Sequence, residues 1–357
     1  MKTSEKSALV VGGGVIGLAS AFRLARANFR VTLFDPTPGM GATRAAAGMV
    51  AASAEIAPGE EENFRLQSGA LGAWRALAAD LGDVTGRELT LMEVGTLLVG
   101  WDQSDRRLVD QYVDIANEFG VQPRRVRRDE ETAMFEGVTG RINDGLYIAG
   151  DAWVNPDQVV DVLKEANAIL GVEVVNETVT DICADVDHVT AVTSSTSFDR
   201  PLGLIATGVG ALPRGVESPS GNRIRPIHGI TVRVRGVDRS DQPMIRSFVR
   251  GRSVYMVSRP GGYNVLGATS EERSESSVRV GELERLLRDV LDVIPDLESA
   301  AVLETRSGLR PASDDLRPFF EILGGGRWAW SSGHFRHGVT LAPLAASEAL
   351  RFAESVS

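Results

Sequence analysis

Hydrophobic and polar positions follow a strand–helix–strand pattern at the start of the chain. Residues 8–34 begin with the apolar run ALVV, continue with GGGVIGLASAFRLARAN and end with FRVTLFD. The short apolar runs are typical of buried strands, and the longer segment has the spacing of a helix. Its small residues fall where a helix must approach a sheet closely. We therefore predict a βαβ unit in this region.

Helical periodicity returns in later segments. Residues 157–170 give the clearest case, because Asn155 and Pro156 stand at the start of the segment and Gly171 follows its end. Apolar residues recur at helical spacing in four other segments, 64–81, 105–119, 281–294 and 339–353. We predict a helix in each of these segments.

Strand patterns are of two kinds. Residues 89–100 are predicted to form strands around a turn, and the runs at 172–175 and 201–208 each predict a strand. Between residues 227 and 268 the pattern changes to short alternating runs: IHGITVRVRG, MIRSFV, SVYMVS and YNVLGAT. Such alternation is typical of an antiparallel sheet.

The order of these elements predicts two interleaved domains of different class. A Rossmann-like α/β domain with a parallel sheet is expected from residues 1–80, 145–220 and 301–357. An α+β domain with an antiparallel sheet is expected from residues 81–144 and 221–300, and it would bind the substrate. The length of 357 residues suits such a composite.

Composition and charge narrow the choice of partners. Hydrophobic residues make up 43% of the chain, which is enough for a sizeable core, and the net charge is −10. This charge disfavours nucleic acid and anionic membranes as partners. The single cysteine, Cys183, excludes an intrachain disulfide, and we expect it to be a small buried strand residue. No stretch approaches the roughly 20 apolar residues of a membrane span, and the N-terminal apolar run is too short for a signal peptide, so we predict a cytoplasmic location.

A dinucleotide site is indicated between the first predicted strand and helix. Gly12, Gly14 and Gly17 form the pattern G-x-G-x-x-G at this turn. Gly12 permits the tight turn, Gly14 lets the backbone approach a pyrophosphate, and Gly17 allows close helix–strand packing. Asp35 closes the second strand and is placed to bind a ribose hydroxyl. Together these features predict dinucleotide binding, the alternative being a glycine-rich turn without a ligand.

The segment after Asp35 favours FAD over NAD. Residues 36–49, PTPGMGATRAAAGM, are small and basic only at Arg44. Such a loop, opening into a helix, could follow the larger part of FAD, and ATG at 206–208 fits a late strand beside it. An ordinary alanine-rich helix start explains the alanines equally well.

The stretch GHFRHGVTLAP, residues 333–343, contains two of the four histidines. A metal site is disfavoured because His334 and His337 have no third ligand nearby. The helix expected from about Val339 would instead present free N–H groups and a positive dipole end, which would stabilise a reduced flavin. His334 is expected to be a hydrogen-bonded structural residue, whereas the role of His337 stays open.

With these motifs assembled, the chain resembles the glycine oxidase family, within the D-amino acid oxidase-like flavoproteins. The blocks that carry the resemblance are VVGGGVIG, TRAAAGMVAASAE, VNPDQVVDVL, VYMV, NVLGAT, SGLRPASDD and GHFRHGVTLAP. The resemblance implies non-covalent FAD and a small amino acid or amine substrate that is oxidised to an imine by hydride transfer. It also implies reoxidation of the flavin by molecular oxygen to give hydrogen peroxide, and a role in thiamine biosynthesis. We also expect a homo-oligomer.

The resemblance further implies which residues bind the two ligands. The substrate would be positioned by Tyr255, Arg310 and Arg336, without an essential acid or base, and Arg310 would bind the carboxylate. Three positions depart from the family pattern: Ser270, His337 and His228, where methionine, asparagine and lysine are common. The cofactor contacts implied are Val15, Ile16, Asp35, Pro36, Ala42, Thr43, Ala47, Gly48, Met49, Val179, His334, Phe335, Arg336, His337, Gly338, Val339 and Thr340.

Other functions remain open at this level. A D-amino acid dehydrogenase that passes electrons to a quinone or carrier would have the same motifs. A specialised-pathway enzyme could act on an amine other than glycine, as the departures at Ser270 and His337 permit. A flavoprotein kept for binding or assembly without turnover is disfavoured, because Tyr255, Arg310 and Arg336 are all present.

Overall fold

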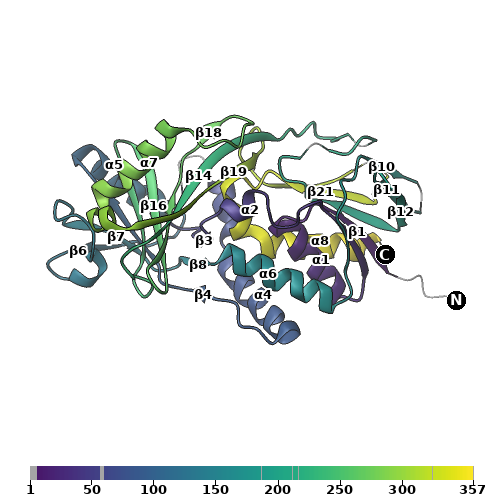
Figure 1. Ribbon diagram of the computed structural model, residues 1–357, viewed down its shortest axis with the longest axis horizontal. Helices are drawn as coiled ribbons and strands as arrows, with labels where there is room; N and C mark the ends of the chain where they lie inside the picture. Colours follow the sequence, from purple (N-terminus) through teal and green to yellow (C-terminus); the bar gives the residue numbers. More distant parts are fainter. Residues whose placement is uncertain are drawn as a thin grey trace.

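The chain forms two halves that meet at a central cavity. The structure, a computed structural model, describes residues 6–56, 60–185, 187–210, 212–215, 217–323 and 325–356. An α/β half lies at the right of Figure 1 and an antiparallel half at the left. This arrangement agrees with the predicted fold class, a Rossmann-like domain combined with an antiparallel-sheet domain.

The α/β half is built on a mostly parallel sheet with strand order β20-β21-β13-β1-β2-β9. β1 is buried along its whole length, which explains why the sequence there is a continuous apolar run rather than an alternating one. The edge strand β20 is antiparallel to β21. The bounds of the strands are β1 Ser7–Val11, β2 Arg30–Phe34, β9 Glu173–Val175, β13 Leu202–Ile205, β20 Phe319–Ile322 and β21 Trp328–Ser332.

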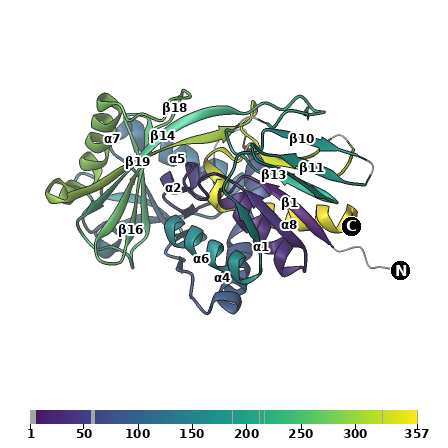
Figure 2. The same ribbon diagram turned by 45° about the vertical axis from the view of Figure 1, so that its right-hand side comes forward.

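Helices cover one face of this sheet and a small antiparallel sheet covers the other (Figure 2). Helix α1 contacts both α6 and α8, and α4 contacts the same two helices. The indole of Trp74 on α4 donates to the carbonyl of Val339 at 3.0 Å, so α4 is tied to the start of α8. The bounds are α1 Val15–Arg26, α4 Ala70–Thr85, α6 Pro156–Ile169, α8 Gly338–Val356, β10 Asp181–Ala184, β11 Val189–Val192 and β12 Ser197–Arg200.

The periodic segment 64–81 forms two helices instead of the single helix predicted. Helix α3, Glu61–Gln67, ends at Ser68, and α4 begins after Gly69. The hydroxyl of Ser68 donates to the carbonyl of Arg65 at 2.8 Å, a local bond that competes with helix continuation. The apolar spacing continues across the break, so periodicity alone gave no sign of it.

The antiparallel half is a large sheet with strand order β18-β14-β17-β16-β15-β5-β7-β6. Helix α5 contacts β5 and β15, whereas α7 packs on β15, β16 and β17. Met244 packs in the cluster that contains residues of α5, and its neighbour Ile245 packs with α7, so the two helices cover opposite faces. The bounds are β5 Thr96–Gly100, β6 Arg124–Arg127, β7 Asp144–Ile148, β14 Arg225–Arg235, β15 Met244–Val249, β16 Arg252–Arg259, β17 Tyr263–Gly267, β18 Glu271–Glu272, α5 Gln103–Glu118 and α7 Val280–Val293.

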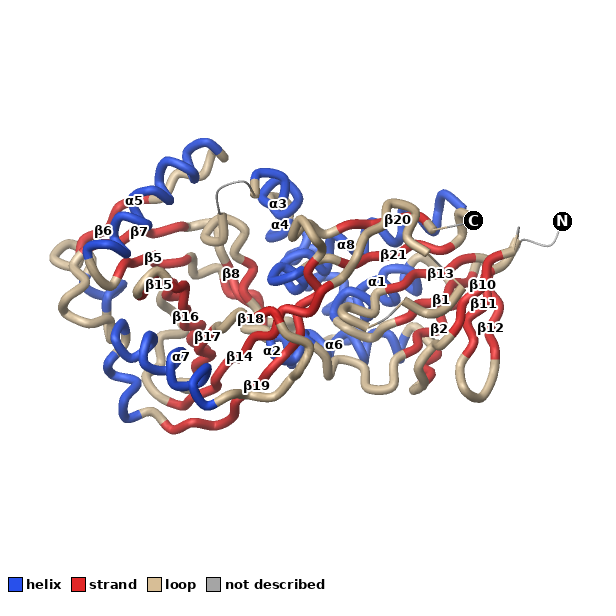
Figure 3. The backbone as a smooth tube through the Cα atoms, turned by 90° about the horizontal axis from the view of Figure 1, so that it is seen from above, coloured by secondary structure: helices blue, strands red, loops and turns tan. Residues whose placement is uncertain are grey.

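A long strand, β19 Ala301–Ala312, joins the two halves by pairing with β14 along its length (Figure 3). β19 also contacts the short helix α2, Ala42–Ala45, of the α/β half. Residues 301–312 and strand β7 therefore share the antiparallel sheet with β14 and β5. The division at residues 80, 144, 220 and 300 stays a prediction, and we now group β7 and β19 with the antiparallel half.

The remaining elements are short. A small sheet of strand order β3-β8-β4 lies between the two halves, and η3 leads into α8. Their bounds are β3 Met49–Val50, β4 Leu91–Met92, β8 Ala152–Val154, η1 Thr132–Phe135, η2 Pro295–Ser299 and η3 Phe335–His337. Within the described ranges, no helix combines the length and apolar character needed to cross a bilayer.

Cys183 lies in β10 but is exposed, so the expectation that it is buried was wrong: the outer sheet leaves this side chain to solvent.

Candidate functional site

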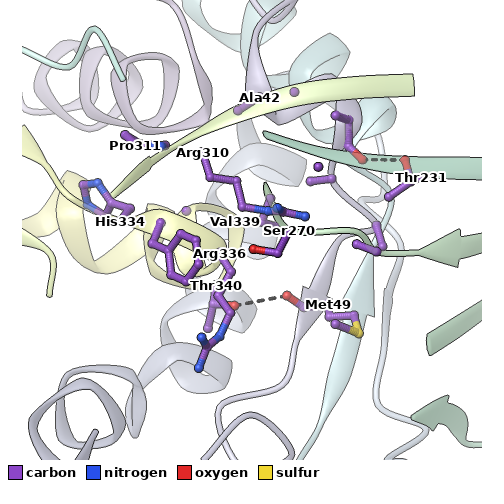
Figure 4. Close-up of a pocket in the computed structure, with 18 of the residues that line it drawn as sticks. Ala42, Met49, Thr231, Ser270, Arg310, Pro311, His334, Arg336, Val339 and Thr340 are labelled. Atoms are coloured by element: carbon purple, nitrogen blue, oxygen red, sulfur yellow. Dashed lines mark hydrogen bonds between the residues drawn. The ribbon is translucent and has the colours of Figure 1, made fainter. Parts of the chain in front are cut away.

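A cavity of about 890 Å³ lies where the two halves meet (Figure 4). On one side it is bordered by the glycine turn before α1, the loop around α2 and the start of α8. On the other side it is bordered by strands of the antiparallel sheet, by α5 and by part of α7. Segments far apart in the sequence therefore line one continuous space.

The glycine turn leaves room for a ligand at one position only. Gly12 has φ of 107°, which favours glycine, and a Cβ on Gly17 would lie 1.8 Å from the carbonyl oxygen of Gly12. A Cβ on Gly14 would meet only the hydroxyl of Thr43, at 3.6 Å. Gly17 is therefore required for packing, whereas Gly14 faces open space at the N-terminus of α1, where a phosphate is stabilised by free N–H groups.

Asp35 and Thr43 hold this turn. The carboxylate of Asp35 accepts hydrogen bonds from the backbone N–H of Gly13 and of Thr37, both at 2.7 Å, and the residue lines the cavity. The hydroxyl of Thr43 accepts from the N–H of Val15 at 3.0 Å. Each oxygen of a carboxylate can accept more than one bond, so Asp35 can still receive a ribose hydroxyl.

The loop at residues 44–47 is held by buried groups of the antiparallel sheet. Arg233 donates to the carbonyls of Arg44 and Ala46 at 3.0 and 3.3 Å, and Arg259 donates to that of Ala47 at 2.8 Å. Burial lowers the pKa of both guanidinium groups, and that of Arg259 falls to about 10. Sequence reasoning missed these arginines, which stand in an alternating strand pattern like any outward-facing charge.

The start of α8 closes the cavity at its other end. The N–H groups of its first turn have no partner within the helix and carry its positive dipole end. The hydroxyl of Thr340 donates to the carbonyl of Met49 at 3.1 Å (Figure 4), which fixes α8 against the loop. Burial lowers the pKa of His334 to about 4, so its ring is neutral at pH 7.

These features fit FAD. Gly14 and the small side chains after Gly39 leave a lined channel from the glycine turn to α8, and the N-terminus of a helix stands at each end of it. Four of the cofactor residues expected from the sequence lie outside the lining: Gly17, Pro36, Val179 and His337. The other expected residues line the cavity: Gly12, Gly14, Val15, Ile16, Asp35, Ala42, Thr43, Ala47, Gly48, Met49, His334, Phe335, Arg336, Gly338, Val339 and Thr340.

Tyr255 and Arg310 lie together at the sheet side of the cavity. Burial raises the pKa of the Tyr255 phenol to about 12, and within the described part of the chain this hydroxyl has no hydrogen-bond partner. The guanidinium of Arg310 donates to the carbonyl of Thr269 at 3.1 Å and has no carboxylate partner among the described residues. A buried guanidinium in this state is suited to bind an anion.

Arg336 occupies a different position. In Figure 4 its guanidinium points away from that of Arg310. It lies 2.6 Å from the carboxylate of Glu60 and 3.3 Å from that of Glu55. The structure thus brings Tyr255 and Arg310 together, whereas Arg336 is paired with two acids across the cavity. Sequence reasoning did not identify Glu55 as a lining residue.

The three departures from the family pattern have different positions. Ser270 lines the cavity beside Arg310 (Figure 4), whereas His228 and His337 are buried outside the lining. The Nδ1 atom of His228 lies 3.1 Å from the carboxylate of Glu282 on α7. Glu282 also accepts a hydrogen bond from the hydroxyl of Thr269, whose carbonyl binds Arg310. His228 therefore belongs to a network that supports the loop behind Arg310.

Among the described residues, no three His, Cys, Asp or Glu side chains are arranged to hold a metal ion. The fold and the site together define a dinucleotide-binding flavoprotein. More particularly, the chain belongs to the FAD dependent oxidoreductase family, whose model matches residues 7–350, and FAD is its cofactor.

Relatives and solved structures agree with this assignment. The chain is 29% identical over 349 residues to glycine oxidase of Geobacillus kaustophilus (strain HTA426), covering 96% of this chain and 91% of that protein. It is 27% identical over 350 residues to glycine oxidase of Bacillus subtilis (strain 168), covering 94% and 89%. The crystal structure of glycine oxidase from Geobacillus kaustophilus is similar with a TM-score of 0.88 and 26% identity, covering 98% of this chain and 95% of that chain.

Proposed function

We propose that this protein is an FAD-dependent amine oxidase. Its substrate would be glycine or a related small amino acid, which is oxidised to the imine, with molecular oxygen as acceptor and hydrogen peroxide as product. The observation that carries the proposal is the guanidinium of Arg310, which lines the cavity and is bonded to a backbone carbonyl rather than to a carboxylate of the described residues. The similarity to glycine oxidases supports the same substrate class.

The side chains at the sheet side of the cavity would position the substrate. Arg310 would bind the carboxylate through two parallel N–H bonds, and the Tyr255 hydroxyl would donate to the same group. When FAD is bound, its flavin supplies the chemistry by accepting the hydride from the α-carbon. The protein contributes geometry, because two fixed contacts on the carboxylate leave the α-carbon little freedom. No side chain is assigned as an essential acid or base.

The start of α8 would serve the electrostatic part of the reaction. Its positive dipole end, with the N–H groups of Gly338, Val339 and Thr340, would stabilise negative charge that develops on a reduced flavin. His334 beside it is neutral at pH 7 and adds no charge of its own.

Thiamine biosynthesis as the pathway, homo-oligomeric assembly and a cytoplasmic location stay predictions.

A peroxide assay tests the proposal. Purified holoprotein should release hydrogen peroxide with at least one of glycine, sarcosine, D-alanine or D-proline, and the same substrate should bleach the flavin under anaerobic conditions. Bleaching without peroxide release in air would replace oxygen by a quinone or carrier and make the protein a dehydrogenase. Absence of bleaching with every amino acid would reject the substrate class.

A further inference from the structure

The carboxylate of Glu55 faces the cavity that contains Arg310 and Tyr255. Glu55 lines this cavity, and only 13% of its side chain is exposed. Burial lowers the pKa of Arg310 and raises that of Tyr255; the negative charge of Glu55 opposes the first shift and adds to the second, so its field reaches both groups. A buried acid therefore lies near the two groups assigned to the substrate carboxylate.

The backbone that carries Glu55 is held by several groups. The carboxyl group of Asp151 accepts hydrogen bonds from the N–H of Ser53 at 3.3 Å and of Ala54 at 3.2 Å. The hydroxyl of Tyr112 donates to the carbonyl of Ser53 at 2.6 Å, and Arg246 donates to the carbonyl of Ala54. These bonds fix the backbone from which the Glu55 side chain extends.

The two carboxylate oxygens of Glu55 have different neighbours. Oε2 lies 3.3 Å from Nε of Arg336 and 3.2 Å from Nδ1 of His337. Oε1 lies 3.8 Å from Nη1 of Arg246, which is too far for a hydrogen bond. Within the described part of the chain no donor is bonded to Oε1. A buried carboxylate oxygen that faces a cavity in this state is a site for a donor on a ligand.

Glu55 is ionised in this environment. Burial by itself would raise the pKa of its carboxyl group. The hydrogen bond to His337 and the charges of His337, Arg246 and Arg336 outweigh burial and hold the pKa well below its usual range. Glu55 is therefore an anion at neutral pH, and it is an acceptor rather than a base.

We propose that Oε1 of Glu55 accepts an N–H hydrogen bond from the substrate amine while Arg310 binds the carboxylate. This inference rests on the proposed function. A cation and an anion at one cavity match the two ends of a zwitterionic α-amino acid. The pair therefore selects primary and secondary α-amino acids over carboxylic acids that lack the amine, because such acids leave Oε1 without a donor.

Two probes separate the amine contact from the carboxylate contact. Glycine contains both groups, whereas acetate contains only the carboxylate. Anaerobic reduction of the holoprotein gives the half-saturating concentration of glycine, and the flavin absorbance change gives the Kd of acetate. In Glu55→Gln the half-saturating concentration of glycine should rise roughly 10- to 100-fold, the range expected for one hydrogen bond to a charged group. The acetate Kd should change less than about 3-fold, because Arg310 is untouched.

A matched control removes a charge elsewhere on the same segment. Glu62 on α3 is exposed and pairs with Arg317 at the surface. Glu62→Gln makes the same chemical change, and both ligands should bind it as they bind the wild type. Glu55→Asp keeps the negative charge beside Arg336 and His337 but withdraws the carboxylate by one methylene, so it should show the same selective loss for glycine.

Three results would overturn the inference. One is an unchanged half-saturating concentration of glycine in Glu55→Gln. Another is an equal weakening of glycine and acetate binding, which would mean that Glu55 only supports its neighbours. The third is loss of FAD from both Glu55 variants, which would assign the residue to the cofactor site. Failure of the wild type to be reduced by any amino acid, while it still binds acetate, would reject the proposed function itself.

Discussion

The guanidinium of Arg310 packs directly on the backbone of Gly229. A Cβ at Gly229 would lie 2.2 Å from Nη1 of Arg310, so a side chain there would displace the guanidinium. The two residues sit on paired strands, with Gly229 of β14 opposite Gly308 of β19, two residues before Arg310. The orientation of the fork is therefore set by backbone packing and by the carbonyl of Thr269, and it does not depend on an acid.

Arg310→Lys should raise the KM for an α-amino acid strongly while FAD stays bound. Lysine keeps the charge but loses the two parallel N–H bonds and the packing on Gly229. Loss of a buried charge-assisted pair typically costs about 2–5 kcal/mol, which corresponds to roughly 30- to several-thousand-fold in kcat/KM. Steady-state kinetics with the preferred amino acid measure this change.

The control for this substitution is an amine without a carboxylate, whose oxidation should be far less affected. Intact turnover of amino acids by Arg310→Lys would mean that the carboxylate is bound elsewhere, with Arg336 as the next candidate. A wild type that prefers amines without a carboxylate would reject the assigned substrate class.

Two glycines of the turn should respond differently to valine. Gly14→Val should fold but lose FAD, because its Cβ points into open space next to Thr43, where the pyrophosphate is expected. Gly17→Val should fail to fold, since its Cβ would collide with the carbonyl of Gly12. Far-UV circular dichroism and flavin absorbance separate the two outcomes, and an apo but folded Gly17→Val would contradict the assignment.

Asp35→Ala should weaken FAD binding less than Gly14→Val does. The substitution removes an acceptor for the expected ribose contact and for the N–H of Gly13, at a cost of about 1–3 kcal/mol. The flavin should still leave the protein on acid or heat denaturation, because the cofactor is predicted to be non-covalent. Fluorescence titration of the apoprotein with FAD measures the change, and equal losses in both variants would undermine the separate roles.

Arg233→Gln should lower FAD affinity at least tenfold although Arg233 lies on the other half of the molecule. The shorter side chain cannot reach the carbonyls of Arg44 and Ala46, which would lose their donors next to the cofactor. Arg235→Gln is the matched control, since Arg235 is exposed on the same strand. FAD titration of both variants measures the effect, and similar affinities would show that the loop is fixed without Arg233.

The stability of the protein should decrease between about pH 4 and pH 7 through Asp151. Burial raises the pKa of Asp151 to about 7 in the folded state, against about 4 in an unfolded chain. Between these values the folded state keeps a proton that the unfolded state has lost, so stability falls as pH rises and this contribution is gone above pH 7. The total is roughly 4 kcal/mol at most.

Urea unfolding of the wild type and of Asp151→Asn across pH 4–8 tests this contribution. The asparagine variant should be less stable at low pH, because its amide cannot accept all the bonds from Thr96, Ser53 and Ala54. Its stability should also show less pH dependence than that of the wild type. Parallel pH profiles of the two proteins would exclude Asp151 as the titrating group.

Much of the fold could be predicted from the sequence because its signals are local. The segments that form α6, α7 and α8 have capping residues or long apolar periodicity. The glycines of the turn before α1 have a fixed spacing in the sequence. The pairing of β19 with β14 could not be predicted, since the partners of a strand are set by contacts far away in the sequence. The break at Ser68 was missed because a hydroxyl bond interrupts the helix without changing the apolar pattern.

The candidate site also contains some residues that could be predicted from the sequence and others that could not. Gly12, Gly14 and Asp35 could be recognised from one stretch of chain. Arg233 and Arg259 could not be recognised in this way. Their role depends on hydrogen bonds to carbonyls near residue 45, and only the fold brings these groups together. The same holds for Glu55, which stands in a loop with other acids and differs from them only in its neighbours.

The cavity is bordered by segments far apart in the sequence, with the glycine turn near residue 12 on one side and α8 from Gly338 on the other. On the ribosome the phosphate side of the site would emerge first and the flavin side last. A nascent chain cannot close around the flavin until the whole antiparallel half has been made. FAD capture is thus a late event in biosynthesis, and the yellow colour of a preparation reports on chains that were completed as well as folded.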